Sequence, residues 1–208
     1  MEKLTYEKAI TALLVTDPYN DLISDGGKLW NRVKAVAEAN NCISNMLHVL
    51  TTARKAGLRA FLCDASSLPA RRLRDLEVHC ADSETRKAEP SFRLRHVGGE
   101  IRSEFQPEPG EIVATEHWCS SGFANTDLDL QLKKHGIHKL IVIGLIAHTC
   151  IEATVRYAAE LGYEVTVVSD AVADYSDREM HAALEVNLPN YASATRATAN
   201  RPSSSCSW

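Results

Sequence analysis

Three short apolar runs constrain the fold of this chain more than any other feature of its sequence. They are TALLVTD at 11–17, KLIVIGL at 139–145 and YEVTVVSD at 163–170, and polar or turn residues bound each of them. Continuous apolar runs of this length are typical of strands that are buried on both faces of a parallel sheet. The weaker runs RAFLCD at 59–64 and EIVAT at 111–115 predict two more strands.

Helical patterns lie between these predicted strands. Apolar residues recur at helical spacing over 37–56, and 126–135, 150–161 and 177–186 show similar patterns. Several of these segments are followed by a glycine, which can adopt the left-handed conformation that ends a helix. The repeated order of strand, helix and strand predicts an open α/β sheet with helices on both faces.

The length and composition of the chain favour a single folding unit. With 208 residues, of which 45% are hydrophobic, the chain is long enough for one compact domain with a sizeable core. We expect that domain to span 1–196. The segment 65–110 carries many charges and four of the seven prolines, and we expect a long excursion near the site. The polar, serine-rich stretch 197–208 predicts a flexible tail.

Charge and cysteine usage exclude several classes of protein. The 23 basic and 27 acidic residues are mixed along the chain, so we expect no nucleic-acid partner. No run approaches the ~20 apolar residues of a membrane helix, and MEKLTYEKAI lacks the apolar core of a signal peptide. We therefore expect no membrane partner and a soluble, cytoplasmic protein. The six scattered cysteines suit neither a zinc ribbon nor a disulfide framework.

In an open α/β sheet, ligands bind beyond the carboxyl ends of the strands. Cys150 is a candidate site residue by this rule. Cys150 follows the turn GLIAHT after a predicted strand and opens a predicted helix. Unpaired N–H groups and the helix dipole at that position favour a thiolate and could hold an oxyanion. The alternative is that Cys150 is a small apolar residue in a buried helix.

Asp17 lies at the same predicted edge, because it ends the first strand. Partial desolvation at the end of an apolar strand tends to raise the pKa of a carboxyl group towards that of a useful base. The alternative is that Asp17 only caps the turn DPYND. The convergence of Asp17 and Cys150 at one edge favours a chemical role for both.

Three stretches resemble the isochorismatase-like cysteine hydrolase superfamily: LLVTDPYNDL, SSGFANTDLDLQLKKHGIHKLIVIGL and GLIAHTCIEATVRYAAELGYEVTVVSDA. The resemblance implies a three-layer α/β/α fold with a six-stranded, mostly parallel sheet. It also implies a triad of Asp, Lys and Cys, of which Asp17 and Cys150 match two members. A cis peptide at Leu145-Ile146, and an oxyanion hole formed by the N–H groups of Ile146 and Cys150, carry over as well. The resemblance further implies a small-molecule substrate and a homo-oligomer, either a dimer or a tetramer, and we expect no cofactor.

The chain departs from this family at the lysine. The segment VATEHWCSSGF places Glu116 at that position if one residue is inserted, or His117 if none is. Glu116 is the preferred candidate, because Glu116 and Asp17 would form a pair of carboxylates that share one proton. His117 could instead supply positive charge near Cys150. A further alternative is that Glu116 pairs with an arginine such as Arg102.

Four other residues are candidates for the substrate pocket, together with His117. Tyr19, Trp118 and Phe123 could clasp a planar or apolar substrate, although a role as core filler is as reasonable for these aromatic residues. His148 could line the mouth of the site or form a hydrogen bond within its turn. We expect no metal, because LCDASSLPARR offers Asp64 but no histidine before His79.

Three functions follow from these observations. The first is a cysteine hydrolase that cleaves a C–N bond of a small amide, ureide or carbamoyl compound through a thioester on Cys150. The second is an isochorismatase-type hydrolase of a vinyl ether, which depends on Asp17 and does not require the cysteine. The third is a binding paralogue without turnover, since the usual lysine is missing.

Overall fold

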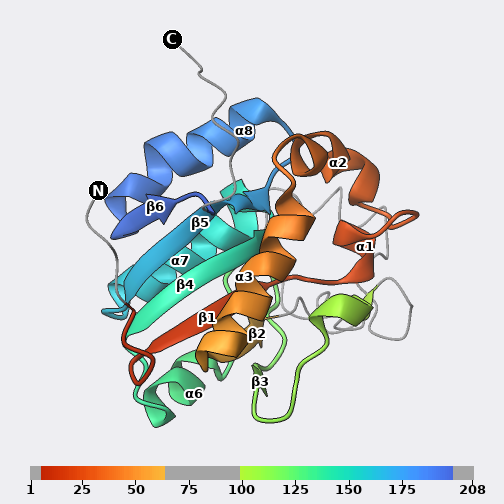
Figure 1. Ribbon diagram of the computed structural model, residues 1–208. Helices are drawn as coiled ribbons and strands as arrows, with labels where there is room; N and C mark the ends of the chain where they lie inside the picture. The colour runs from red at the N-terminus through yellow and green to blue at the C-terminus, as the bar shows by residue number, and fades with distance from the viewer. Residues whose placement is uncertain (1–5, 64–98, 199–208) are drawn as a thin grey trace, which may run out of the picture.

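The computed structural model describes residues 6–63 and 99–198 and contains a six-stranded parallel sheet between helices (Figure 1). The strand order is β3-β2-β1-β4-β5-β6, and every neighbouring pair is parallel. The strands are β1 (Thr11–Thr16), β2 (Arg59–Cys63), β3 (Ile112–Val113), β4 (Lys139–Leu145), β5 (Glu164–Ala173) and β6 (Ala194–Arg196). The predicted α/β fold is confirmed.

Helices cover both faces of the sheet (Figure 1). One face carries α1 (Asn20–Ile23), α2 (Trp30–Ala39) and α3 (Cys42–Ala56). The other carries α6 (Leu128–Lys134), α7 (Glu152–Glu160), the π-helical turn η4 (Ala182–Asn187) and the short helix η5 (Leu188–Asn190). The remaining helical elements are η2 (Ser103–Phe105), the π-helical turn η3 (Ala147–Ile151) and α8 (Asp177–His181).

Alternation along β1 explains why its sequence is apolar without interruption. Leu13 and Val15 pack in the core beneath α2 and α3, whereas Ala12 and Leu14 pack in the core beneath α6 and α7. Successive side chains of a strand point to opposite faces, so a strand covered on both faces needs an apolar residue at every position. All six residues of β1 are buried.

Several predicted boundaries were wrong. The helix expected over 37–56 is two helices, because the chain breaks at Asn41, which has φ 56°, and α2 begins earlier, at Trp30. The helix expected from 150 begins instead with η3, so Cys150 lies inside the first turn. Asp170 lies within β5, where its carboxylate accepts hydrogen bonds from the N–H and hydroxyl of Thr198.

Of the excursion expected over 65–110, the part up to residue 98 lies outside the described residues. Its last part runs beside the segment that follows Asp17: Asn20 N donates to the carbonyl of Glu100, and Arg102 N donates to the carbonyl of Pro18. The tail expected over 197–208 also lies outside the described residues, except for its first two positions.

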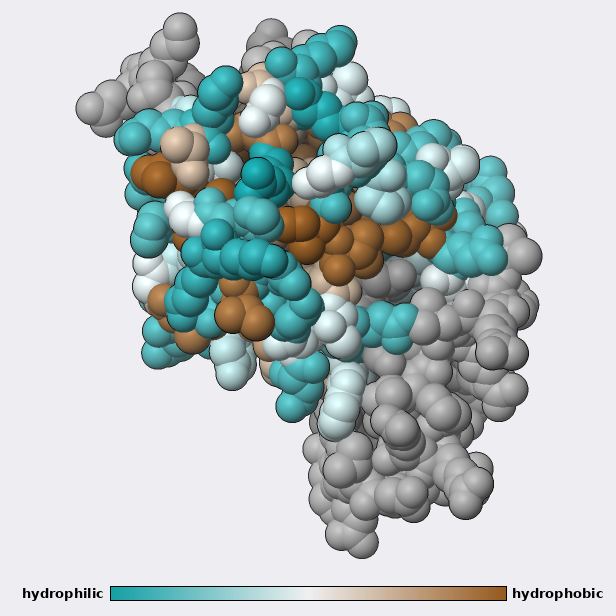
Figure 2. Space-filling model, turned by 90° about the horizontal axis from the view of Figure 1, so that it is seen from below, coloured by the Kyte–Doolittle hydropathy of each residue, from teal (hydrophilic) through white to brown (hydrophobic). Residues whose placement is uncertain are grey.

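The surface on the side of β3 and α6 is mostly hydrophilic, with an apolar band across its middle (Figure 2). Val113 of β3 is 46% exposed, and Leu130 of α6 is 67% exposed. Within the described parts of the chain, no helix has the length and apolar character needed to cross a membrane.

Candidate active site

The strand order reverses between β1 and β4, and both candidate catalytic residues follow these two strands. Asp17 comes directly after β1, while η3, which contains Cys150, begins two residues after the end of β4. The connections from β1 and β4 lead to opposite faces of the sheet, which opens a crevice at its carboxyl edge. The predicted convergence of the two residues therefore has its physical cause in the topology.

Backbone geometry at the ends of β1 and β4 is specialised. Asp17 has φ 54°, in the left-handed region that a residue with a side chain rarely adopts, and its N–H donates to the carbonyl of Cys63 over 2.8 Å. Gly144 has φ 129°, and a Cβ atom there would lie 2.1 Å from the carbonyl oxygen of Thr16. Only glycine allows the two strands to approach so closely just before Asp17.

The side chains of Asp17 and His117 form a buried pair. His117 Nε2 lies 2.9 Å from Asp17 Oδ1, and both side chains have no solvent exposure. Two groups of this polarity are tolerated in a dry interior because they hydrogen-bond to one another. The pair fixes the Asp17 carboxylate with one oxygen directed towards the imidazole.

The structure reverses the order in which the sequence ranked Glu116 and His117. Glu116 is half-buried, and no hydrogen bond or ion pair joins it to another described residue. Arg102, the alternative partner, pairs with Glu104 instead. Without the assumed insertion before SSGF, the alignment places His117 at the position that contacts Asp17.

The motif NTDLD contributes an aspartate, Asp127, that holds the segment next to this pair in place. Asp127 accepts a hydrogen bond from the N–H of Thr115 over 2.6 Å and another from Gln131 in α6. Burial would raise the pKa of Asp127, but these hydrogen bonds outweigh it and hold the pKa below its usual value. Asp127 thereby ties the strand-like segment that ends at His117 to the start of α6.

The turn between β4 and α7 surrounds the Cys150 thiol with polar groups. The peptide bond between Leu145 and Ile146 is cis, and Cys150 is only 8% exposed. The Thr149 hydroxyl donates to the Cys150 sulfur over 3.9 Å, and the backbone N–H of Ile146 is close enough to lower the pKa of the thiol. The carbonyl of Ile146 accepts from the N–H groups of Thr149 and Ile151, which closes the turn.

The structure contradicts the expectation that the helix start would favour a Cys150 thiolate. Burial raises the pKa of the thiol well above its usual value, and the negative charge and hydrogen bonding of Asp17 raise it further. The hydrogen bonds from Ile146 and Thr149 lower it, but by less. The balance of these effects favours the protonated thiol, which would need a base in order to act as a nucleophile.

Two predicted pocket residues lie in the two cores. Tyr19 is 3% exposed within the core beneath α2 and α3. Phe123 is 5% exposed in the core beneath α6 and α7, where its ring stacks on that of Tyr157 with centroids 6.0 Å apart. This placement favours the core role that the sequence left open for both. Trp118, next to His117, is 37% exposed.

His148 forms a pair with Asp174, which directly follows β5. Its Nδ1 lies 2.6 Å from Asp174 Oδ1, and its backbone N–H donates to Asp174 Oδ2 over 2.8 Å. No local pattern indicates this partner, because Asp174 lies 26 residues away and beyond a strand whose end was predicted earlier in the chain. The side chain of His148 therefore bonds to a residue outside its own turn, at the end of the neighbouring strand.

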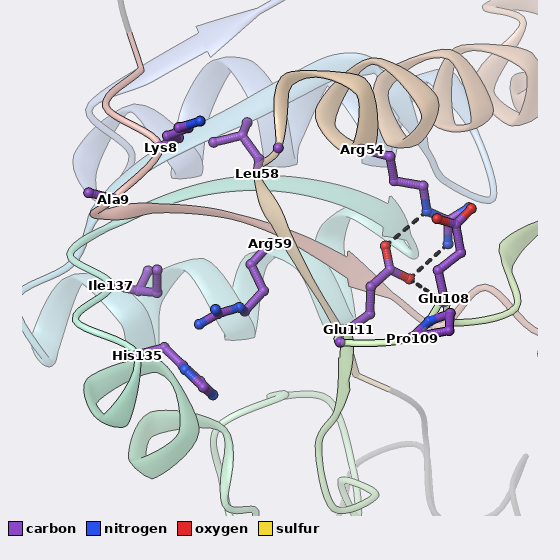
Figure 3. Close-up of a pocket in the computed structure, with 12 residues that line it drawn as sticks. Lys8, Ala9, Arg54, Leu58, Arg59, Glu108, Pro109, Glu111, His135 and Ile137 are labelled. Carbon is purple, nitrogen blue, oxygen red and sulfur yellow. Dashed lines mark hydrogen bonds and ion pairs between the residues drawn. The ribbon is translucent and has the colours of Figure 1, made fainter.

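A separate cavity of about 360 Å³ lies at the opposite edge of the sheet, where β1 and β2 begin (Figure 3). Lys8, Arg59 and His135 line one part of it. In the other part, Glu111 accepts two hydrogen bonds from Arg54 (Figure 3). Because this cavity lies at the amino ends of the strands, it is distinct from the edge that holds Asp17 and Cys150.

No group of three histidine, cysteine or acidic side chains suited to a metal ion occurs in the described ranges 6–63 and 99–198. The prediction of no metal was based on Asp64 and His79, which lie outside the described residues. It stays a prediction.

Comparison with known proteins gives consistent results. A family model described as the isochorismatase domain matches residues 11–199. The ureidoacrylate amidohydrolase RutB of Variovorax paradoxus (strain S110) is 28% identical over 200 residues, covering 91% of this chain and 79% of that protein. The secreted isochorismatase effector Isc1 of Verticillium dahliae is 40% identical over 91 residues, covering 44% of this chain and 47% of that protein. The crystal structure of N-carbamoylsarcosine amidase from Thermoplasma acidophilum is similar with a TM-score of 0.68 and 27% identity, covering 94% of this chain and 99% of that one.

The family model covers the sheet, the helices on both faces and every candidate catalytic residue. The chain therefore belongs to the isochorismatase family, and the enzyme class to which it is assigned is that of the hydrolases.

Proposed function

We propose that the protein is a cysteine hydrolase that cleaves a C–N bond of a small amide, ureide or carbamoyl compound through a thioester on Cys150. The observation that carries the proposal is the buried thiol of Cys150 beside the buried carboxylate of Asp17 at the switch point of the sheet. The names of two similar proteins, a ureidoacrylate amidohydrolase and an N-carbamoylsarcosine amidase, describe substrates of this class.

In the first half of the reaction, Asp17 takes the proton of the Cys150 thiol as the sulfur attacks the substrate carbonyl carbon. The C=O π bond breaks, and the oxyanion receives hydrogen bonds from the N–H groups of Ile146 and Cys150. The C–N bond then breaks, and protonated Asp17 gives its proton to the leaving nitrogen. The products of this half are the free amine and a thioester on Cys150.

In the second half, Asp17 is again a base and takes a proton from a water molecule that attacks the thioester carbonyl. The same two N–H groups hold the second oxyanion. The C–S bond breaks, and the proton on Asp17 returns to the sulfur, which regenerates the thiol and releases the acid. Because the pKa of the Cys150 thiol is raised, the sulfur retrieves that proton readily.

In this proposal His117 replaces the lysine of the family pattern as the partner of Asp17. Its hydrogen bond to Oδ1 holds the carboxylate in orientation. Oδ2 is buried and has no hydrogen bond of ordinary length to the described residues, which leaves it available to exchange the proton of Cys150. Glu116 has no part in the proposed reaction.

The test is hydrolysis of a panel that includes ureidoacrylate, N-carbamoylsarcosine and simple amides, followed by amine or ammonia release. We expect Cys150→Ala to lower kcat/KM on the best substrate by at least about 10³-fold, since the nucleophile is lost. Cys119→Ser is the matched control, because this half-buried thiol should tolerate the change. Trapping of an acyl adduct on Cys150 by intact-protein mass spectrometry would identify the intermediate.

Full activity of Cys150→Ala would rule out the thioester. It would favour the second candidate, hydrolysis of a vinyl ether with Asp17 as the acid, which is consistent with the similarity to the effector named as an isochorismatase. Isochorismate should be included in the panel for this reason. No turnover of any compound, together with unselective alkylation of the thiols, would instead favour a binding protein.

A further inference from the structure

Asp174 anchors the nucleophile turn from a neighbouring strand. It follows the last residue of β5, and β5 pairs with β4 in the register Leu145↔Ala173. Asp174 therefore lies beside Ile146, the first residue after β4. Its side chain has no solvent exposure. A buried carboxylate at this position needs donors from the surrounding backbone and side chains.

Three donors meet this carboxylate, and two of them belong to one residue. His148 N donates to Oδ2 over 2.8 Å, and His148 Nδ1 lies 2.6 Å from Oδ1. The third is Tyr175 N, which donates to Oδ1 over 2.7 Å. When the Asp174 carboxylate is ionised it can only accept, and the imidazole then donates from Nδ1. His148 is thus held at both its backbone and its side chain by a single carboxylate.

Contacts with Tyr175 also restrict the imidazole of His148. The Tyr175 ring meets the His148 ring edge-on, with centroids 5.6 Å apart, and the Arg32 guanidinium lies 4.0 Å above the centre of the Tyr175 ring. Only 30% of the His148 side chain is exposed. These contacts connect η3 to Arg32 of α2 through the rings of His148 and Tyr175.

In the sequence, His148 stands two residues after Ile146 and two residues before Cys150, the residues whose N–H groups would hold the oxyanion. We infer that His148 and Asp174 are positioning residues that hold these two N–H groups in place for the oxyanion. The inference rests on the proposed function. Neither residue takes part in proton transfer, and burial and Asp17 affect the thiol more than the Ile146 N–H does, so removal of the pair should affect the oxyanion site much more than the reactivity of the thiol.

Two measurements distinguish an effect on the oxyanion site from an effect on the reactivity of the thiol. The first is the rate at which iodoacetamide alkylates Cys150, followed by peptide mass spectrometry. The second is protection of Cys150 from alkylation by propionaldehyde. In that reaction the sulfur bonds to the aldehyde carbon, the C=O π bond breaks, and the thiol proton moves to the oxygen, giving a hemithioacetal. Only the second measurement depends on donors to that oxygen.

The variants are His148→Ala, His148→Asn and Asp174→Ala. Asn can place its amide Nδ2 where Nδ1 of histidine lies, so it retains a donor to Asp174 without an imidazole. We expect His148→Ala and Asp174→Ala to weaken protection by propionaldehyde about tenfold or more, as for loss of a charged hydrogen bond. The alkylation rate without aldehyde should change less than about twofold. His148→Asn should behave as the wild type, as should His138→Ala, a control at an exposed histidine.

Three outcomes would overturn the inference: unchanged protection in His148→Ala, equal losses of alkylation and protection, or a His148→Asn variant as impaired as His148→Ala. Thermal unfolding of each variant shows whether the fold is retained, and the two His148 variants decide the question if Asp174→Ala does not fold. A wild-type protein that propionaldehyde does not protect would count against the thioester chemistry itself. That failure appears before any variant is compared.

Discussion

Cys150 and Asp17 are both buried, and their mutual influence determines how the thiol can react. The carboxylate raises the pKa of the thiol, as burial does, so the sulfur keeps its proton near neutral pH. A cysteine with these properties does not act as a preformed thiolate. In the proposed mechanism Asp17 acts as the base when the sulfur attacks, and the hydrogen bond from His117 would keep Asp17 oriented for that task.

Asp17→Asn should make Cys150 more reactive with an alkylating agent while hydrolysis is lost. The negative charge next to the sulfur disappears, so the pKa of the thiol falls, and each unit of fall gives about tenfold more thiolate below that pKa. The measurement is the rate of alkylation by iodoacetamide from about pH 6 to about pH 10, where the rise in rate should move to lower pH. Asp25→Asn, at a side chain that is 89% exposed, is the control. Slower alkylation of Asp17→Asn would contradict the electrostatic account.

His117 and Glu116 should differ sharply in their effect on turnover. His117→Ala removes the partner of a buried carboxylate, and a hydrogen bond of this kind contributes about 1.5–3 kcal/mol, or roughly 10- to 100-fold in kcat/KM. His117→Gln retains a donor at the position of Nε2 and should lose less. Glu116→Gln should remain within about twofold of the wild type. Steady-state kinetics of the three variants on one substrate checks the assignment, which is refuted if Glu116→Gln is as impaired as His117→Ala.

At the scale of the elements, β1 and β4 bring the two reactive residues together because they are neighbours in the sheet. Their register pairs Thr16 with Gly144, the last positions before the site segments begin. The absence of a side chain at Gly144 allows the backbone to pass close to Thr16. The apolar runs of the sequence predicted both strands, but the reason for the glycine appears only when the strands are paired.

Gly144→Ala should destabilise the protein far more than the same change at another glycine with positive φ. At Gly162 (φ 89°) a Cβ atom would meet nothing within 4 Å, so Gly162→Ala has only the backbone cost of about 1–2 kcal/mol. Gly144→Ala adds a clash with the carbonyl of Thr16, and we expect a total loss above about 4 kcal/mol or no folded protein. Urea or thermal denaturation of both variants measures the difference. Equal stability of the two would show that β1 and β4 can separate at this point.

At the scale of the whole molecule, the sheet divides the structure into an edge with the proposed chemistry and an edge without it. Asp17, His117 and Cys150 gather at the carboxyl ends of the strands, whereas the cavity lined by Lys8 and Arg59 lies where the strands begin (Figure 3). Helix connections diverge only at the first edge, so a hollow at the second edge is not evidence for a catalytic site.

Arg59→Ala should therefore leave hydrolysis unchanged. Arg59 is exposed at the first position of β2, and among the described residues it forms no hydrogen bond or ion pair that the substitution would break. We expect kcat and KM to stay within about twofold of the wild type, in contrast to the loss in Cys150→Ala. Kinetics of both variants with the same substrate tests this division. A large loss in Arg59→Ala would mean that the amino edge of the sheet contributes to the reaction.

Much of the fold could be predicted from the sequence, because the patterns involved are local. Burial on both faces leaves a continuous apolar run in central strands such as β1 and β4, and apolar runs located five of the six strands, including the partly exposed β3. The strand Ala194–Arg196 has only three residues and no apolar run, so no such signal marks it. The break at Asn41 was missed for a similar reason, since the apolar spacing continues across it while the backbone turns into the left-handed region.

The sequence by itself determined which residues stand at the carboxyl edge of the sheet, including Asp17 and Cys150, because apolar runs predict where the strands end. Only the tertiary structure decided which of them touch. It selected His117 over Glu116, joined His148 to Asp174 across β5, and raised the pKa of the Cys150 thiol instead of lowering it. Partner choice and desolvation depend on distances between segments far apart in the chain, and no local pattern encodes those distances.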